Sequence, residues 1–166
     1  MCIRDSAHPD HVERLVLVSA SMGIADEMER AARRERDNLL AERIRAIGSN
    51  DFLTEWLAQP MFASLPNDPD ERDARRHNTP SGLASSLRCA GTGSQSWLDD
   101  PLRTLNVPTL AIAGAGDDRF ADEARALSRT VPTGTFALVP GAGHAAHLQQ
   151  PALTARLVET FCSNYG

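Results

Sequence analysis

The alternation of apolar and polar positions along the chain predicts short buried strands and amphipathic helices. Three continuous apolar runs rich in β-branched residues, 15–18, 108–113 and 135–139, are typical of strands buried on both faces of a sheet. Helical segments follow the last two runs, at 121–129 and 151–162. This order of strand, helix, strand and helix predicts right-handed crossovers and a parallel sheet.

A long stretch without any strand pattern separates the first predicted strand from the second. Asp26 and Glu29 stand in a capping-box relation, and the helix that they begin should extend to Gly48. A second amphipathic helix is indicated by the spacing of Phe52, Leu53, Trp56 and Leu57. Thr79-Pro80 should open a third helix.

This helical insertion is far longer than an ordinary crossover between parallel strands. Ligands of open α/β sheets bind outside the carboxyl ends of the strands, so an insertion at that edge is placed to cover them. We therefore predict a helical lid over residues 21–100.

Composition and charge narrow the function classes. Apolar residues make up 42% of the chain and charged residues 23%, which is an ordinary globular balance. The 17 basic residues, all arginine, against 22 acidic ones give a net charge of −5, which argues against nucleic-acid binding. No apolar run is long enough to span a membrane, and the three cysteines show no disulfide or zinc pattern. We expect a cytoplasmic protein that binds neither nucleic acid nor membranes.

Two glycine-rich loops carry the candidate chemistry, and each follows a predicted strand. Residues 114–120 contain Asp117 and residues 140–147 contain His144. An acid followed by a histidine on successive strand ends matches the last two members of a Ser–Asp–His triad. Each loop alone is more often a structural turn, but the two together in this order favour catalysis.

Other residues compete for these roles. Asp118 is the alternative acid and His147 the alternative base, although His147 should lie along the next helix. The remaining histidines, His8, His11 and His77, are interpreted as surface residues.

The same motifs resemble those of the α/β-hydrolase superfamily over residues 8–161. Gly114-x-x-Asp117 with Phe120 is similar to the acid loop of that family, which favours Asp117 over Asp118. Gly141-x-Gly143-His144 is similar to its histidine loop, and residues 8–18 to the segment that leads into its sixth strand. The resemblance implies an incomplete α/β-hydrolase fold, with parallel C-terminal strands, flanking helices and a helical lid.

The insertion resembles one subfamily more specifically. Residues 56–65, Arg75-x-x-Asn78, residues 82–88 and the Gly91-Thr92-Gly93-x-Gln95 segment are similar to 2-succinyl-6-hydroxy-2,4-cyclohexadiene-1-carboxylate synthases of menaquinone biosynthesis. These enzymes eliminate pyruvate from a cyclohexene precursor. The resemblance implies that Arg33 and Arg75 bind carboxylates of a small polycarboxylate substrate, that Trp56 lines the pocket, and that no metal or organic cofactor takes part.

Alternatives remain open for several of these residues. Trp56 fits core packing of its helix as well as pocket lining. Arg30, Arg34 and Arg36 are interpreted as a solvated face paired to the acids Glu27, Glu29 and Asp37. The Gly91-Thr92-Gly93 turn is interpreted as structural.

No G-x-S-x-G motif, which would supply the nucleophilic serine and its strained elbow, occurs in the 166 residues. We expect residues 1–7 to be a non-native leader and residues 8–166 to be the C-terminal part of one hydrolase domain from a truncated gene product. This polypeptide alone should then be inactive and prone to aggregation through an exposed sheet edge. An ester or carbon–carbon bond hydrolase, and a non-catalytic remnant, are the alternative functions.

Overall fold

A computed structural model describes residues 8–62, 65 and 69–164, in two compact units. Residues 8–22, 65 and 98–164 belong to a strand-containing unit, and residues 23–62 and 69–97 to a helical unit. The predicted leader at 1–7 lies outside the described residues. No helix among the described residues is both long enough and apolar enough to cross a lipid bilayer.

The first unit is built on a three-stranded parallel sheet in the order β1 (Leu15–Val18), β2 (Thr109–Gly114) and β3 (Gly134–Val139). Leu15 of β1 lies opposite Thr109 of β2, which lies opposite Gly134 of β3. The predicted strands and their parallel arrangement are confirmed. Burial on both faces holds for β2 alone, because β1 and β3 flank it in the described sheet and keep partly exposed positions.

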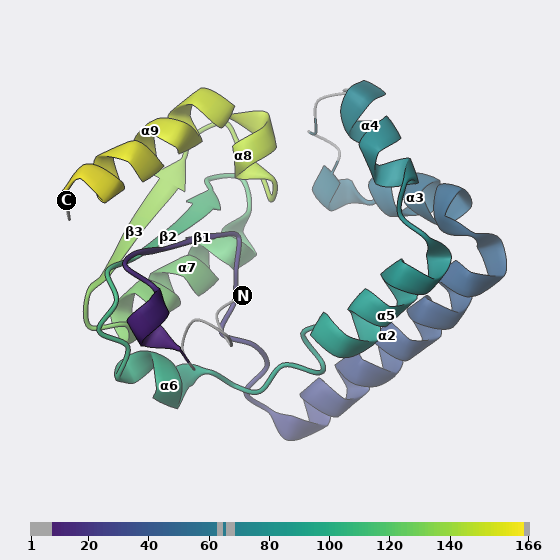
Figure 1. Cartoon of the computed structure of the whole chain (residues 1–166), viewed down its shortest axis with the longest axis horizontal. Coiled ribbons are helices and arrows are strands. Elements are labelled where there is room, and N and C mark those ends of the chain that lie inside the picture. The colour runs from purple at the N-terminus through teal and green to yellow at the C-terminus, as the bar shows by residue number, and fades with distance from the viewer. Residues whose placement is uncertain (1–7, 63–64, 66–68, 165–166) are drawn as a thin grey trace. The chain divides into compact units, whose positions relative to one another are not determined.

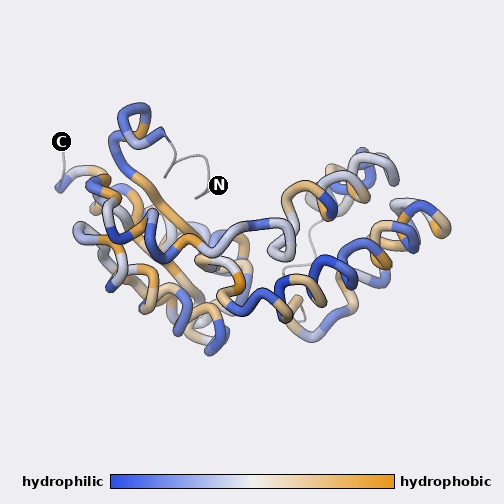
Figure 2. Tube along the Cα trace, turned by 90° about the horizontal axis from the view of Figure 1, so that it is seen from below, coloured by the Kyte–Doolittle hydropathy of each residue, from blue (hydrophilic) through white to orange (hydrophobic). Residues whose placement is uncertain are grey.

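Helices cover both faces of this sheet (Figure 1). One face packs against α6 (Asp99–Arg103) and α7 (Asp118–Thr130), and the other against α8 (Ala146–Gln149) and α9 (Pro151–Ser163). In Figure 2 the strand segments carry the orange of apolar residues, whereas apolar and polar residues alternate along the helices of this unit. A 3₁₀ turn, η1 (Pro9–His11), precedes β1.

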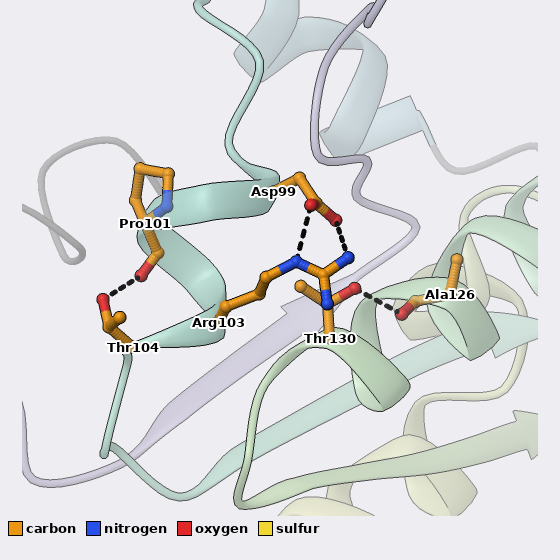
Figure 3. Close-up of polar contacts among 6 residues, drawn as sticks. All are labelled: Asp99, Pro101, Arg103, Thr104, Ala126 and Thr130. Carbon is orange, nitrogen blue, oxygen red and sulfur yellow. Dashed lines mark hydrogen bonds and ion pairs between the residues drawn. The ribbon is translucent and has the colours of Figure 1, made fainter.

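The sequence pattern did not predict α6, whose five residues are too few for a helical periodicity to show. Its first turn is held by a two-pronged ion pair in which Arg103 donates from Nε and Nη2 to Asp99, at 2.8 and 3.3 Å (Figure 3). Just before α6, the amide of Leu98 donates to the carbonyl oxygen of Met22. The chain therefore leaves and re-enters the first unit at adjacent points, which is how one insertion can be accommodated between β1 and β2.

The second unit consists of helices, which the structure places at α2 (Glu27–Ile47), α3 (Ser49–Leu57), η2 (Pro60–Phe62), α4 (Pro69–Arg76) and α5 (Pro80–Ala90). The predicted long helix, its amphipathic successor and the helix opened by Thr79-Pro80 are confirmed as α2, α3 and α5. The strongly polar α4 was not predicted because it carries no apolar stripe.

Local signals explain these boundaries. The Asp26 side chain accepts a hydrogen bond of 2.8 Å from the Glu29 amide at the start of α2. Gly48, at φ +85°, ends α2, and Thr79 caps α5 by accepting from the Gly82 amide at 3.1 Å. Close packing of α2 against α5 then forms the centre of this unit, with Ala41, Ile44 and Ala84 fully buried.

Candidate active site

Asp117 ends the loop that follows β2 and begins α7. Its Oδ1 accepts a hydrogen bond of 3.2 Å from the Phe120 amide, so the carboxylate caps the helix from the N-cap position. This cap uses one carboxylate oxygen and fixes the side-chain orientation. The second oxygen is thereby directed away from the helix and is available for another partner.

His144 lies in the loop that follows β3, and glycines bring this loop against the loop after β2. A Cβ on Gly114 would run into the main chain of Ala142 and Gly143, so a larger residue there would push the loops apart. The Gly116 amide donates to the Ala142 carbonyl oxygen at 2.8 Å, and Gly141 turns the chain at φ +70°. The glycines of both motifs therefore determine how closely Asp117 and His144 approach.

The two predicted side chains meet in a hydrogen bond, with His144 Nδ1 2.8 Å from Asp117 Oδ2. Both are largely buried, at 24% and 16% side-chain exposure, so water screens the interaction incompletely. The Phe120 ring packs against the imidazole with 4.5 Å between ring centres. A carboxylate at Nδ1 holds an imidazole in the tautomer whose Nε2 can accept a proton, which is the arrangement that general-base chemistry requires.

A third residue reaches this arrangement from the end of β1. The Ser19 hydroxyl donates a hydrogen bond of 2.6 Å to the main-chain carbonyl oxygen of His144. Ser19 has φ +47°, an unfavourable conformation for a residue with a side chain, and its amide donates to the Ile112 carbonyl oxygen. The ends of all three strands therefore contribute to holding the imidazole. Sequence reasoning missed this role, although position 19 directly follows a predicted strand.

The competing residues lie elsewhere. Asp118 is exposed as the first residue of α7, and His147 is exposed on α8. The other histidines, His8, His11 and His77, are exposed as predicted.

The helical unit contains a cavity of about 240 Å³ that Trp56 and Arg75 both line. Apolar side chains supply most of its wall, and Asn78 and Ser86 add polar groups. Trp56 also packs on Phe52 and Phe62, with ring centres 5.6 and 6.0 Å away. It therefore packs within the unit and also borders the cavity, and the structure does not decide between the two interpretations left open by the sequence.

Arg33 is not among the described residues that line this cavity. Its Nε donates to Asp37 Oδ1 at 2.9 Å, across one turn of α2. The expected pairing of Arg30 and Arg34 with acids is wrong: Arg30 donates to the carbonyl oxygen of Ile24 at 2.8 Å, and Arg34 to that of Gly93 at 3.1 Å. Carbonyl oxygens near the helix were closer to these guanidinium groups than the acids on the helix face.

The Gly91-Thr92-Gly93 turn packs directly on α2. A Cβ on Gly93 would lie 2.4 Å from the main-chain nitrogen of Arg34, which is closer than real Cβ atoms approach, and this explains the need for glycine there. The structural interpretation of this turn is consistent with that packing. Among the described residues, no three His, Cys, Asp or Glu side chains gather in a group that could bind a metal ion.

Comparisons with known proteins agree with this geometry. The alpha/beta hydrolase family profile matches residues 2–157. A relative from Bacillus subtilis is 33% identical over 95% of this chain and 59% of its own length. The 2-succinyl-6-hydroxy-2,4-cyclohexadiene-1-carboxylate synthase of Serratia proteamaculans is 30% identical over 95% of this chain and 61% of its own.

The solved structure of MenH from S. aureus superposes with a TM-score of 0.87 at 28% identity, covering 92% of this chain and 59% of that one. A thermophilic esterase from Thermogutta terrifontis has the same fold, with a TM-score of 0.76 at 24% identity. The chain thus spans about 60% of the length of these proteins. The family match extends over nearly the whole sequence and includes both glycine-rich loops, and the chain belongs to the alpha/beta hydrolase family.

Proposed function

We propose that this chain supplies the acid–histidine pair and the substrate-binding helices of an enzyme that forms 2-succinyl-6-hydroxy-2,4-cyclohexadiene-1-carboxylate by eliminating pyruvate. The observation that carries the proposal is the 2.8 Å contact between Asp117 and His144 at adjacent strand ends. The likeness of the insertion to synthases of this name supports the choice of reaction over other hydrolase-fold chemistry.

In the proposed mechanism, His144 acts as general base through a serine hydroxyl of a G-x-S-x-G elbow, a motif that these 166 residues do not contain. The serine alkoxide that forms takes a ring proton of the substrate and becomes a hydroxyl again. The bond to the leaving group breaks, and the proton held by His144 passes to the departing pyruvate. Asp117 orients the imidazole and stabilises the imidazolium that forms. No step requires a metal ion or an organic cofactor.

Substrate binding is assigned to the helical unit. The cavity lined by Trp56 and Arg75 combines an aromatic wall with a guanidinium group, which suits a carboxylate attached to an apolar ring. Arg33 is proposed to bind a second carboxylate. We place the reaction in the cytoplasm, as the cysteine pattern indicates, with a small polycarboxylate as the substrate.

The test measures pyruvate release and cleavage of p-nitrophenyl esters in parallel. Both are assayed for the 166-residue chain and for the full reading frame that contains it. Pyruvate release that disappears in His144→Ala supports the synthase. Ester cleavage without pyruvate release favours the hydrolase alternative, and absence of both activities from the full reading frame favours a non-catalytic protein.

A further inference from the structure

Asp37 is a nearly buried acid in the middle of α2, with 5% of its surface exposed. Its Oδ1 accepts the Arg33 Nε hydrogen bond of 2.9 Å. Its Oδ2 is buried without a hydrogen-bond partner among the described residues. A carboxylate in such surroundings loses hydration that one hydrogen bond replaces only in part, so burying Asp37 costs folding free energy. We therefore expect this buried acid to serve a function.

The turn after α5 is shaped around this carboxylate. A Cβ on Gly91 would lie 2.7 Å from Asp37 Oδ2 and would also clash with the Leu87 carbonyl oxygen. Glycine at position 91 therefore leaves the space that the carboxylate occupies. A side chain at position 91 would displace the Asp37 carboxylate and with it the hydrogen bond to Arg33.

Arg33 is bound differently from Arg43, which also pairs with an acid. Arg43 donates to Glu55 from both Nε and Nη2, at 3.0 and 2.6 Å, which occupies one edge of its guanidinium group. Arg33 donates to Asp37 from Nε, and the structure gives its terminal nitrogens no bond to a described residue. With 34% of its side chain exposed, Arg33 retains access to solvent.

We propose that Asp37 is a positioning residue that holds the guanidinium group of Arg33 so that its two terminal nitrogens are presented together to a substrate carboxylate. Carboxylates bind guanidinium groups best through two parallel hydrogen bonds, and prior orientation reduces the entropy lost on binding. This inference rests on the proposed role of Arg33 in the function above. It also accounts for the glycine at position 91.

The experiment titrates succinate into the chain while side-chain ¹H–¹⁵N spectra record the Arg33 Nε–H signal. In Asp37→Asn, the neutral side chain should weaken the Nε bond, so that the Arg33 signal shifts and the Kd for succinate rises about tenfold. Arg33→Lys keeps the positive charge but lacks the two parallel N–H donors of a guanidinium group. The affinity of this variant for succinate should fall to a similar degree. Glu55→Gln, which breaks the exposed pair with Arg43, is the matched control and should leave succinate binding unchanged.

Unchanged succinate affinity in either Asp37→Asn or Arg33→Lys overturns the inference, as does absence of succinate binding to the unmodified chain. If Asp37→Asn fails to fold by circular dichroism, Arg33→Lys decides alone. The pyruvate assay is independent of this titration. Succinate binding that depends on Asp37, in a protein that releases no pyruvate, would refute the proposed reaction and retain the positioning role.

Discussion

The Ser19 hydroxyl bonds the main-chain carbonyl oxygen of His144 at 2.6 Å, which ties the end of β1 to the loop after β3. The contact joins residues 125 positions apart and accompanies a positive φ at Ser19. Backbone strain of this kind persists where surrounding contacts hold it, often beside functional groups. It indicates that the position of His144 depends on more than its bond to Asp117.

Ser19→Ala should destabilise the chain by about 1 kcal/mol, because it removes the hydroxyl and leaves the positive φ in place. Thermal or urea unfolding measures the loss. The control is Ser163→Ala, which removes a similar hydroxyl-to-carbonyl bond of 2.9 Å at an exposed position on α9 and should have little effect. Equal effects from the two substitutions would contradict a special role for Ser19.

In the full reading frame, Asp117→Asn should lower the rate of pyruvate release by about 10⁴-fold with little loss of stability. Asparagine caps helices as well as aspartate does, so α7 should remain intact. Its amide group can donate to Nδ1, however, which would favour the wrong tautomer of His144. Imidazole ¹⁵N chemical shifts measure the tautomer in the chain itself, and Asp118→Asn is the neighbouring control. A normal tautomer in Asp117→Asn would refute this explanation.

In the full reading frame, Arg75→Ala should raise the KM for the polycarboxylate substrate by about 10- to 100-fold, because one charge-assisted bond to a carboxylate is lost. Arg76→Ala removes the adjacent arginine, which is exposed and lies 3.9 Å from Asp73. Steady-state kinetics on both variants should show the KM effect for Arg75 alone. Similar KM increases in the two variants would point to general loss of positive charge.

Glu123→Gln should stabilise the chain at neutral pH. Burial raises the pKa of Glu123, and the neighbouring Arg119 guanidinium lowers it by a smaller amount. With the folded-state pKa above the unfolded one, stability from this group is present at low pH and is lost as pH rises through the folded-state pKa.

The melting temperature of Glu123→Gln should therefore exceed that of the unmodified chain at pH 7, and the difference should vanish below about pH 4. Glu159→Gln, at an exposed position on α9, serves as the control. A difference that grows as the pH falls would have the wrong sign for this explanation.

Much of the fold could be predicted because its signals are local. The three apolar runs became β1, β2 and β3, and Asp26, Gly48 and Thr79 mark helix boundaries where the pattern placed them. The helices α4 and α6 were not predicted. One is strongly polar and the other has only five residues, so neither shows a hydrophobic periodicity in the sequence.

The approach of Asp117 to His144 was predictable for a related reason. Parallel strands that neighbour each other end at the same edge, so residues just beyond β2 and β3 are brought close by the topology alone. The partners of the arginines on α2 were not predictable in this way. Arg34 donates to the carbonyl oxygen of Gly93, which lies 59 positions away in the sequence, and no residue pattern along the helix predicts that contact.

The amino-acid order alone thus determined which segments become strands and helices, and which acid and histidine follow adjacent strands, because these depend on side-chain periodicity and turn chemistry. The folded chain decided the rest: that Ser19 reaches the His144 carbonyl, that Arg33 is held by a buried Asp37, and that Trp56 and Arg75 share a cavity. Such contacts join residues through space, and their geometry is set by how whole elements pack.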